Sequence, residues 1–203
     1  MQHKQIKTQI MKKLFLSLVA ALVLSISAYS QAVEQGNSLI DVTYGWPNIW
    51  TNVFKEAQTS TNSVNIKASS LGPIGLKYEY MVADKIGVGV IINYANSSLS
   101  YDENNFYYKL SVPRLRFMGK FGFHYGNSEV FDGYSGIGLG YGTWSFSYET
   151  NDPNFNDDDF NVSNIVPVSF RLFTGGRFFF TENLGALLEF GLGGGGLIEG
   201  GLC

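Results

Sequence analysis

Residues 134–142 read Tyr-Ser-Gly-Ile-Gly-Leu-Gly-Tyr-Gly, and apolar side chains alternate there with glycine. Neighbouring side chains of an extended strand point to opposite faces, so Ile137, Leu139 and Tyr141 share one face. This period of two residues predicts a β-strand with a single apolar face. The opposite face carries glycine instead of the lysines, glutamates and threonines of a water-exposed surface.

Seven further segments alternate in the same way, which makes eight predicted strands in all. They cover 39–46, 74–80, 86–94, 114–121, 166–177, 184–193 and 197–203. One face of each is mostly apolar or aromatic, whereas the other mixes glycine with isolated charged residues. The charged residues on that second face are Asp41, Lys77, Glu79, Arg114, Arg116, Lys120, Arg171, Arg177, Glu189 and Glu199. We interpret them as a charge network inside a barrel.

An all-β fold, an eight-stranded antiparallel up-and-down transmembrane β-barrel, accounts for both faces. The lumen of such a barrel is just wide enough for side chains, so glycine relieves crowding there and opposite charges pair. The apolar face then contacts lipid, with tyrosine and tryptophan at the membrane interfaces. A soluble β-sandwich or lipocalin-like barrel is the alternative, but it would expose about ten aromatic side chains to water.

The composition excludes several other classes of protein. Of the 203 residues, 24 are glycine and only 15% are charged, against about 25% charged in a soluble domain. An apolar content of 45% excludes a disordered chain, and a net charge of −3 argues against a nucleic-acid partner. Cys203 is the single cysteine, so neither an intrachain disulfide nor a cysteine-based metal site can form. We expect no cofactor.

The first 32 residues have the pattern of a secretory signal peptide. Lys12 and Lys13 precede the apolar run 14–26, and small residues follow up to Ala32. The run is too short to span a bilayer as a helix, which disfavours the alternative of a retained anchor. We therefore predict a signal peptide at 1–32, with Met11 as an alternative start, and a barrel domain at 33–203.

The predicted links between strands sort into two kinds. The links at 82–85, 122–129 and 181–183 are short or moderate, whereas those at 47–70, 95–106 and 149–164 are longer and polar. The link at 193–196 breaks this alternation. Outer-membrane barrels have short periplasmic turns and longer extracellular loops, so we expect the long links to lie outside the cell.

Residues 134–142, together with the strand 171–180, the turn 181–185 and the strand 188–190, resemble small porin-like outer-membrane β-barrel proteins. These are the OmpA-type and OmpW-type eight-stranded barrels of Gram-negative bacteria. The resemblance implies a location in the cell outer membrane, contact with its lipids and lipopolysaccharide, and assembly by the barrel-assembly machinery. It also implies an extracellular ligand for the long links. The chain differs at Leu202-Cys203, where such barrels usually end in an aromatic residue.

Two segments suggest chemistry beyond the lumen. His124, Ser128 and Glu129 resemble the Ser/His/Glu triad of outer-membrane lipid A deacylases, although a polar turn explains the same residues. In the acidic segment 152–159, oxygen ligands for a cation such as Ca²⁺ stand at alternate positions. They are Asp152, Asn154, Asn156 and Asp158. The segment lacks the glycine and glutamate of an EF-hand, and a solvated loop is the alternative.

The sequence leaves three functions open. The first is a non-enzymatic, porin-like barrel with a structural or surface-interaction role, in which the lumen charges form a closed plug. The second is a passive channel for small solutes lined by the same charges. The third is a barrel enzyme that modifies lipid.

Overall fold

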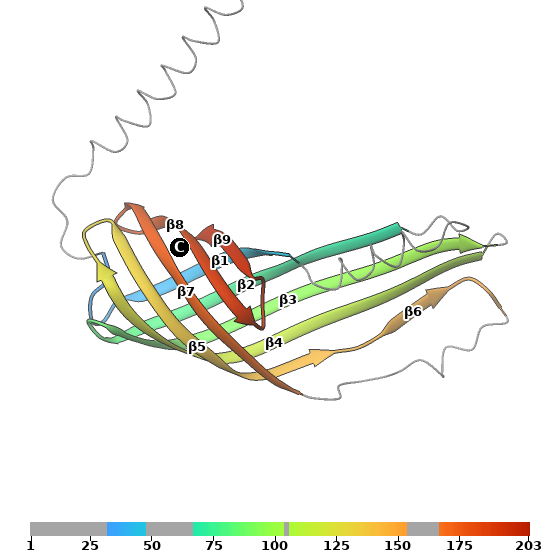
Figure 1. The fold of residues 1–203 in the computed structure, drawn as a ribbon, viewed down its shortest axis with the longest axis horizontal. Helices are drawn as coiled ribbons and strands as arrows, with labels where there is room; N and C mark the ends of the chain where they lie inside the picture. Colours follow the sequence, from blue (N-terminus) through green and yellow to red (C-terminus); the bar gives the residue numbers. More distant parts are fainter. Residues whose placement is uncertain (1–31, 48–66, 104–105, 154–166) are drawn as a thin grey trace, which may run out of the picture.

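The computed structural model describes residues 32–47, 67–103, 106–153 and 167–203, which form β-strands joined by turns (Figure 1). The strands are β1 Ser38–Trp46, β2 Lys67–Ala83, β3 Ile86–Glu103, β4 Phe106–Asn127, β5 Phe131–Trp144, β6 Ser147–Thr150, β7 Val168–Thr181, β8 Leu184–Gly193 and β9 Ile198–Leu202. No helix in these ranges is long and apolar enough to cross a membrane. All but the last residue of the predicted signal peptide lies outside the described residues.

The strands form an eight-stranded closed antiparallel barrel, so the predicted all-β barrel fold is confirmed. With β6 left aside, each strand pairs with the next along the chain, so that β5 pairs with β7, and β9 pairs with β1 to close the ring. β6 is not an additional strand of the barrel, because it pairs with β4 just beyond the residues of β4 that pair with β5. Figure 1 shows β2, β3 and β4 extending far beyond the barrel, with the short strand β6 beside β4 in this extended part.

A proline explains why β5 and β6 are separate strands. On β4, Arg114 pairs with Trp144 of β5 and Ser111 pairs with Ser147 of β6. Pro113 lies between these two β4 residues. Its carbonyl oxygen accepts a hydrogen bond from the Ser145 backbone nitrogen at 3.4 Å. The N–H that proline lacks would point to the same neighbour, so the ladder loses a bond there.

The two faces of the strands are distributed as the alternation predicts. Outward side chains are apolar and exposed, with 49% of Val90 and 61% of Leu139 accessible. Inward side chains include buried charges, of which Arg171 and Arg177 are completely inaccessible. Phe173, an exception to the alternation, points inward beside Ile91, Met118 and Tyr134. The polarity of this barrel is therefore the inverse of a soluble one.

Three strands are much longer than the sequence pattern indicates. The predicted long loop at 95–106 is wrong, because β3 runs to Glu103 and β4 begins at Phe106. The predicted link at 122–129 is also wrong over most of its length, because β4 continues to Asn127. Above Tyr94 the outward side chains are polar, so the apolar alternation ends although the backbone pairing continues. We call the part of β2, β3, β4 and β6 beyond the barrel the extension.

The end of the barrel opposite the extension, here the turn end, is closed by apolar side chains. Val33 lies on the inside with Leu39, Met81 and Phe179, and Val33 and Met81 are fully buried. The segment before β1 is held across this end by backbone bonds from Ala32 to the Ser128 carbonyl and from Gly36 to the Met81 carbonyl. The lumen is therefore sealed there.

We predict that Met81→Ala lowers the free energy of unfolding by about 2–5 kcal/mol, because it leaves a cavity in this apolar floor. The matched control is Val82→Ala, since Val82 is the next residue but points outward. We expect the control to change stability by about 1 kcal/mol or less. Urea unfolding of the refolded protein measures both values, and equal losses would contradict the inward placement of Met81.

Candidate functional site

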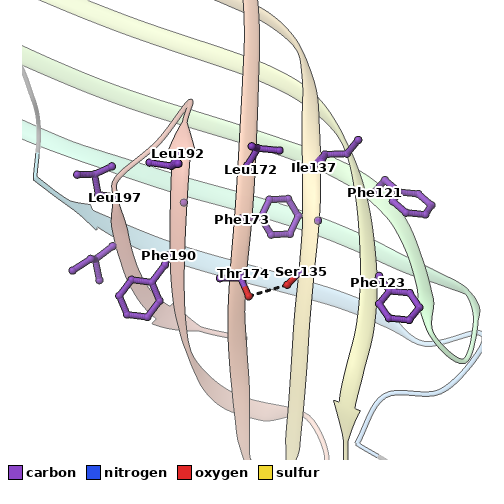
Figure 2. Close-up of a pocket in the computed structure, with 13 residues that line it drawn as sticks. Phe121, Phe123, Ser135, Ile137, Leu172, Phe173, Thr174, Phe190, Leu192 and Leu197 are labelled. Atoms are coloured by element: carbon purple, nitrogen blue, oxygen red, sulfur yellow. Dashed lines mark hydrogen bonds between the residues drawn. The ribbon is translucent and has the colours of Figure 1, made fainter.

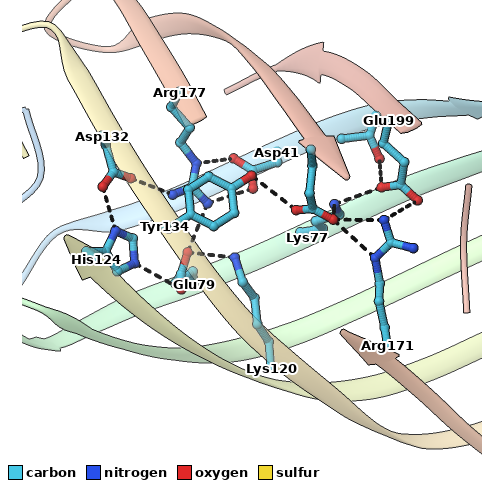
Figure 3. A network of polar contacts seen from close by, with 12 residues as sticks. Asp41, Lys77, Glu79, Lys120, His124, Asp132, Tyr134, Arg171, Arg177 and Glu199 are labelled. Atoms are coloured by element: carbon cyan, nitrogen blue, oxygen red, sulfur yellow. Dashed lines mark hydrogen bonds and ion pairs between the residues drawn. The ribbon is translucent and has the colours of Figure 1, made fainter. Parts of the chain in front are cut away.

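The inward charges nearest the turn end form one group, here the turn-end cluster. It consists of Asp41, Glu79, Lys120, His124, Asp132 and Arg177 (Figure 3). Arg177 binds Asp41 through two nitrogens, at 3.1 Å and 2.8 Å. It also reaches Asp132 and Glu79, each at 2.9 Å. One guanidinium group thus joins carboxylates from β1, β2 and β5.

Lys120 and His124 complete the cluster. The Lys120 Nζ atom lies 2.7 Å from Glu79 Oε2. His124 faces Asp132 with Nδ1 at 2.8 Å and Glu79 with Nε2 at 3.3 Å. Both ring nitrogens meet carboxylate oxygens, so a doubly protonated imidazolium satisfies both contacts. Its charge, with those of Lys120 and Arg177, balances the three carboxylates of the cluster.

A second group, here the mid-lumen cluster, consists of Lys77, Arg171, Glu189 and Glu199. Lys77 Nζ lies 2.8 Å from an oxygen of Glu189 and 2.8 Å from an oxygen of Glu199. Arg171 Nη2 contacts the same two carboxylates at 2.9 Å and 3.0 Å. Two positive and two negative charges make this cluster neutral, and each side chain is at most 1% accessible.

Tyr134 connects the two clusters. Its hydroxyl group donates to Glu189 Oε2 at 3.1 Å, and the Arg177 guanidinium carbon lies 4.2 Å from the centre of its ring. A buried guanidinium over an aromatic face is a favourable cation–π contact. The network therefore runs without interruption from the turn end to the middle of the lumen, as Figure 3 shows.

Glycine makes room for the longest charged side chains. The Glu79 carboxylate occupies the space that side chains on Gly87 and Gly122 would need. The Arg171 guanidinium likewise lies where a side chain on Gly191 or Gly195 would be. The glycines on the inward face thus leave the space that the long charged side chains occupy, because a narrow lumen cannot hold large side chains at every position.

The glycine link between β8 and β9 folds into the lumen. Gly194 and Gly196 are buried, and their carbonyl oxygens accept hydrogen bonds from Arg171 Nη1 at 3.3 Å and 3.2 Å. Gly193 and Gly195 have φ values of 104° and 143°, which side chains rarely adopt. This link covers the mid-lumen cluster on the side of the extension.

Arg114 and Arg116 lie beyond this link, at the mouth of the lumen. Both are on the inward face of β4, and Arg114 Nη2 donates to Ser97 Oγ at 3.4 Å. The other eight residues predicted for the lumen all belong to the two clusters. The structure therefore brings eight of the ten charged residues together and leaves two arginines at the mouth.

Part of the network was not predicted from the sequence. The interpretation of His124 as part of a polar turn is wrong, since His124 is a buried strand residue. Its spacing of four from Lys120 places it on the same strand face, and this signal was available. Asp132 and Tyr134 share an inward face in the same way, but they precede Gly136, where the alternation of apolar residues with glycine begins.

The residues of the possible acyl-transfer triad do not come together. The ring nitrogens of His124 face Asp132 and Glu79, inside the barrel. Ser128 and Glu129 are exposed in the turn between β4 and β5, where Ser128 Oγ accepts a hydrogen bond from the Phe131 backbone nitrogen at 3.2 Å. This arrangement gives Ser128 no contact with a general base.

The cation loop proposed from the sequence is described only at its start. Asp152 accepts a hydrogen bond from the Tyr108 hydroxyl group at 3.0 Å. The other proposed ligands, Asn154, Asn156 and Asp158, lie outside the described residues. Within the described part of the chain, no group of three or more His, Cys, Asp or Glu side chains could hold a metal ion.

The outer wall carries a groove of about 840 Å³ across β4, β5, β7, β8 and β9 (Figure 2). Its sides include Phe121, Phe123 and Phe190. Two small polar residues lie at its base, where the Ser135 hydroxyl donates to Thr174 Oγ1 at 2.8 Å. Because these hydroxyl groups bond to each other, the groove suits hydrocarbon better than a polar ligand.

Comparison with known proteins adds no family assignment. No protein-family model matches the chain, and no curated protein is significantly similar to it. The geometry of the lumen therefore carries the functional argument. That geometry holds buried charges in fixed ion pairs, which is suited to sealing the barrel.

We predict that Arg177→Met lowers the free energy of unfolding by about 3–5 kcal/mol, because it leaves buried carboxylates without their partner. Lys109→Met is the matched control, since Lys109 forms an ion pair of 2.9 Å with Glu149 on the exposed face of the extension. Such a pair contributes about 1 kcal/mol or less. Chemical unfolding of both variants checks this difference, and a loss in Arg177→Met no greater than in the control would contradict it.

Proposed function

We propose that this chain is a membrane-spanning outer-membrane β-barrel protein of a Gram-negative bacterium. Its lumen is closed, and the protein has a structural role or mediates interactions at the cell surface. The observation that supports this proposal best is the inverted polarity of the wall. Charged side chains lie inside, and the outward side chains form a band of apolar residues with a limited height along the strands, here the apolar band. The leader-like pattern of residues 1–32 is consistent with export.

The height of the apolar band fits a membrane. On the outward face of β3 the apolar residues run from Ile86 to Tyr94, a span of nine residues. A transmembrane strand needs about 9–11 residues. The band ends within one row on three adjacent strands: Ile74, Tyr94 and Leu115 are paired neighbours, and the next row holds Leu71, Asn96 and Pro113.

Beyond this level the same face becomes polar. Ser69, Ser98 and Ser111 lie side by side on β2, β3 and β4. The next row consists of Lys67, Ser100 and Lys109. A change from apolar to polar at one height on neighbouring strands is what a membrane boundary requires, because hydrocarbon ends there for all of them.

The closed lumen favours a structural role over a passive channel. The apolar floor, the two ion-pair clusters and the glycine link follow one another along the lumen. The enzymatic alternative has less support, because His124 is engaged by two carboxylates and does not contact Ser128. We propose that the barrel is not an enzyme.

The extension is the part that would act at the cell surface. It continues three wall strands past the apolar band, and Tyr101 and Tyr108 stack across β3 and β4 with ring centres 5.0 Å apart. A paired sheet with tyrosine side chains on one face can present a rigid surface to an extracellular ligand. The outer groove at Phe121 and Phe190 would be filled by acyl chains of membrane lipid.

We expect Val90→Arg to reduce folding into lipid vesicles, at a cost of about 2–4 kcal/mol, because Val90 is in the middle of the apolar band. Val90→Leu keeps the position apolar and serves as the control. The fraction of protein that migrates as heat-modifiable folded barrel on a gel measures the effect. Folding of Val90→Arg at the level of Val90→Leu would mean that this face does not contact lipid.

We also expect no discrete single-channel openings when the refolded barrel is inserted into planar bilayers. The ion pairs of Arg177 and Arg171 cross the lumen and leave no continuous path for ions. The folded state is verified on the same sample by its heat-modifiable migration. Reproducible openings by the folded protein would contradict the closed lumen and favour a passive channel.

A further inference from the structure

The outer wall of the barrel has a patch of small outward residues on two neighbouring strands. On β5 these are Gly133 and Ser135, and on β7 they are Thr174 and Gly176. Ser135 pairs with Thr174, and Gly133 pairs with Gly176. The outward side chains around this patch are large and apolar. The small residues therefore leave a hollow in an otherwise apolar surface.

Two aromatic rings fill only the half of the patch that is nearer the turn end. A Cβ atom added to Gly176 would lie 2.6 Å from the Phe131 ring, and one added to Gly133 would lie 3.2 Å from the Tyr125 ring. These rings thus lie over the two glycines. The other half, the serine and threonine pair, forms the floor of the outer groove of about 840 Å³. This volume is in the range of about 300–1,000 Å³ that is typical of sites for small molecules.

One row of paired residues gives the cross-section of the groove. The successive partners across β4, β5, β7 and β8 are Phe123, Ser135, Thr174 and Phe190. Figure 2 shows the two phenylalanine rings on either side of the small pair. The floor is two strands wide, with about 5 Å between the strand centres, whereas an α-helix with its side chains is about 10–12 Å across. A single hydrocarbon chain fits this floor better than a helix of a partner protein does.

The hydroxyl groups of the floor are already engaged with the protein. The Ser135 hydroxyl donates to Thr174 Oγ1 at 2.8 Å, and the Thr174 hydroxyl donates to the Tyr134 carbonyl oxygen at 3.3 Å. The Tyr125 hydroxyl oxygen lies 3.1 Å from Thr174 Oγ1. Donors that are satisfied within the wall need no polar ligand. Because the sides of the groove are apolar as well, its chemistry suits an apolar molecule.

The floor lies well inside the apolar part of the wall. On β7 the outward residues on the extension side of Thr174 are Leu172 and Phe170, and those on the turn side include Phe178 and Phe180. In the proposed function this height is inside the membrane, where the hydrocarbon comes from the acyl chains of lipid. Association between apolar surfaces in a membrane depends on close packing. A chain in a groove gains more packing contacts than a chain against a flat wall, because it is contacted on three sides.

We infer that the outer groove binds one acyl chain of a membrane lipid as a stoichiometric ligand, so that one lipid molecule stays with each barrel while the surrounding lipid exchanges. The inference rests on the proposed membrane location. The chain packs over the floor of Ser135 and Thr174, between Phe123 and Phe190. This packing distinguishes the bound lipid from the lipid that contacts the rest of the wall.

Photo-crosslinking in vesicles tests the site. The full-length protein is refolded into vesicles of phosphatidylethanolamine and phosphatidylglycerol. A small fraction of the phosphatidylethanolamine carries a diazirine in one acyl chain, and mass spectrometry locates the adducts on protein that migrates as heat-modifiable folded barrel. We expect a saturable adduct, with one lipid per barrel, on the segments of β4, β7 and β8 that line the groove.

Three variants separate the groove from the rest of the wall. Thr174→Leu fills the floor and should reduce the groove adduct about tenfold or more. Ser135→Leu fills the other half of the floor and serves if Thr174→Leu does not fold. Gly119→Leu is the matched control, because it adds the same outward side chain outside the groove, where the nearest atom to the new Cβ is 3.7 Å away. We expect wild-type labelling of the groove in this control.

Thr174→Val tests whether the shape or the polarity of the floor matters, since it removes the hydroxyl group and keeps the size of the side chain. We expect it to keep the adduct. The inference is overturned if adducts are spread evenly around the wall of the folded barrel, if filling the floor leaves the groove adduct unchanged, or if Thr174→Val loses it. Failure of the wild-type protein to fold into the vesicles would overturn the proposed membrane location, and this inference with it.

Discussion

The buried ion pairs of the lumen are the constraint on which the other features depend. Eight strands close around a space that holds side chains but little water, so a charge inside needs an opposite charge within reach. Arg177 and Arg171 meet this need by contacting carboxylates from several strands each. The register of the strands and the positions of the inward glycines follow from this arrangement, because a shift of one residue would turn every charge outward.

The inverted polarity changes what stabilises the barrel. The apolar side chains that would form a core in a soluble protein point outward, and the buried apolar residues form only two small clusters in the described chain. The interior is instead held by hydrogen-bonded charges, with Tyr134 between the two groups. Such a wall favours an apolar environment outside, which is why the proposed membrane location and the ion-pair network support each other.

The unequal lengths of the strands divide the molecule into two parts. Over the apolar band the wall is closed, and the lumen is filled from Val33 at the turn end to the glycine link. Beyond the band, β2, β3 and β4 continue as a paired sheet that is mostly polar on the outward face, with Arg114 and Arg116 at its base. In the proposed function, the closed barrel anchors the chain in the membrane and the extension lies at the cell surface.

The sequence alone determined the strands of the barrel and the face on which each charge lies. Both follow from the period of two, which is a local property of extended backbone. Only the tertiary structure decided which charges pair, since Arg177 and Asp41 are 136 residues apart in the chain. It also revealed that β3 and β4 continue beyond the level of Tyr94, because the outward face of β3 loses its apolar side chains there while the backbone pairing goes on. The carboxylate partners of His124 became evident in the same way, since they come from β2 and β5 and meet it only when the barrel closes.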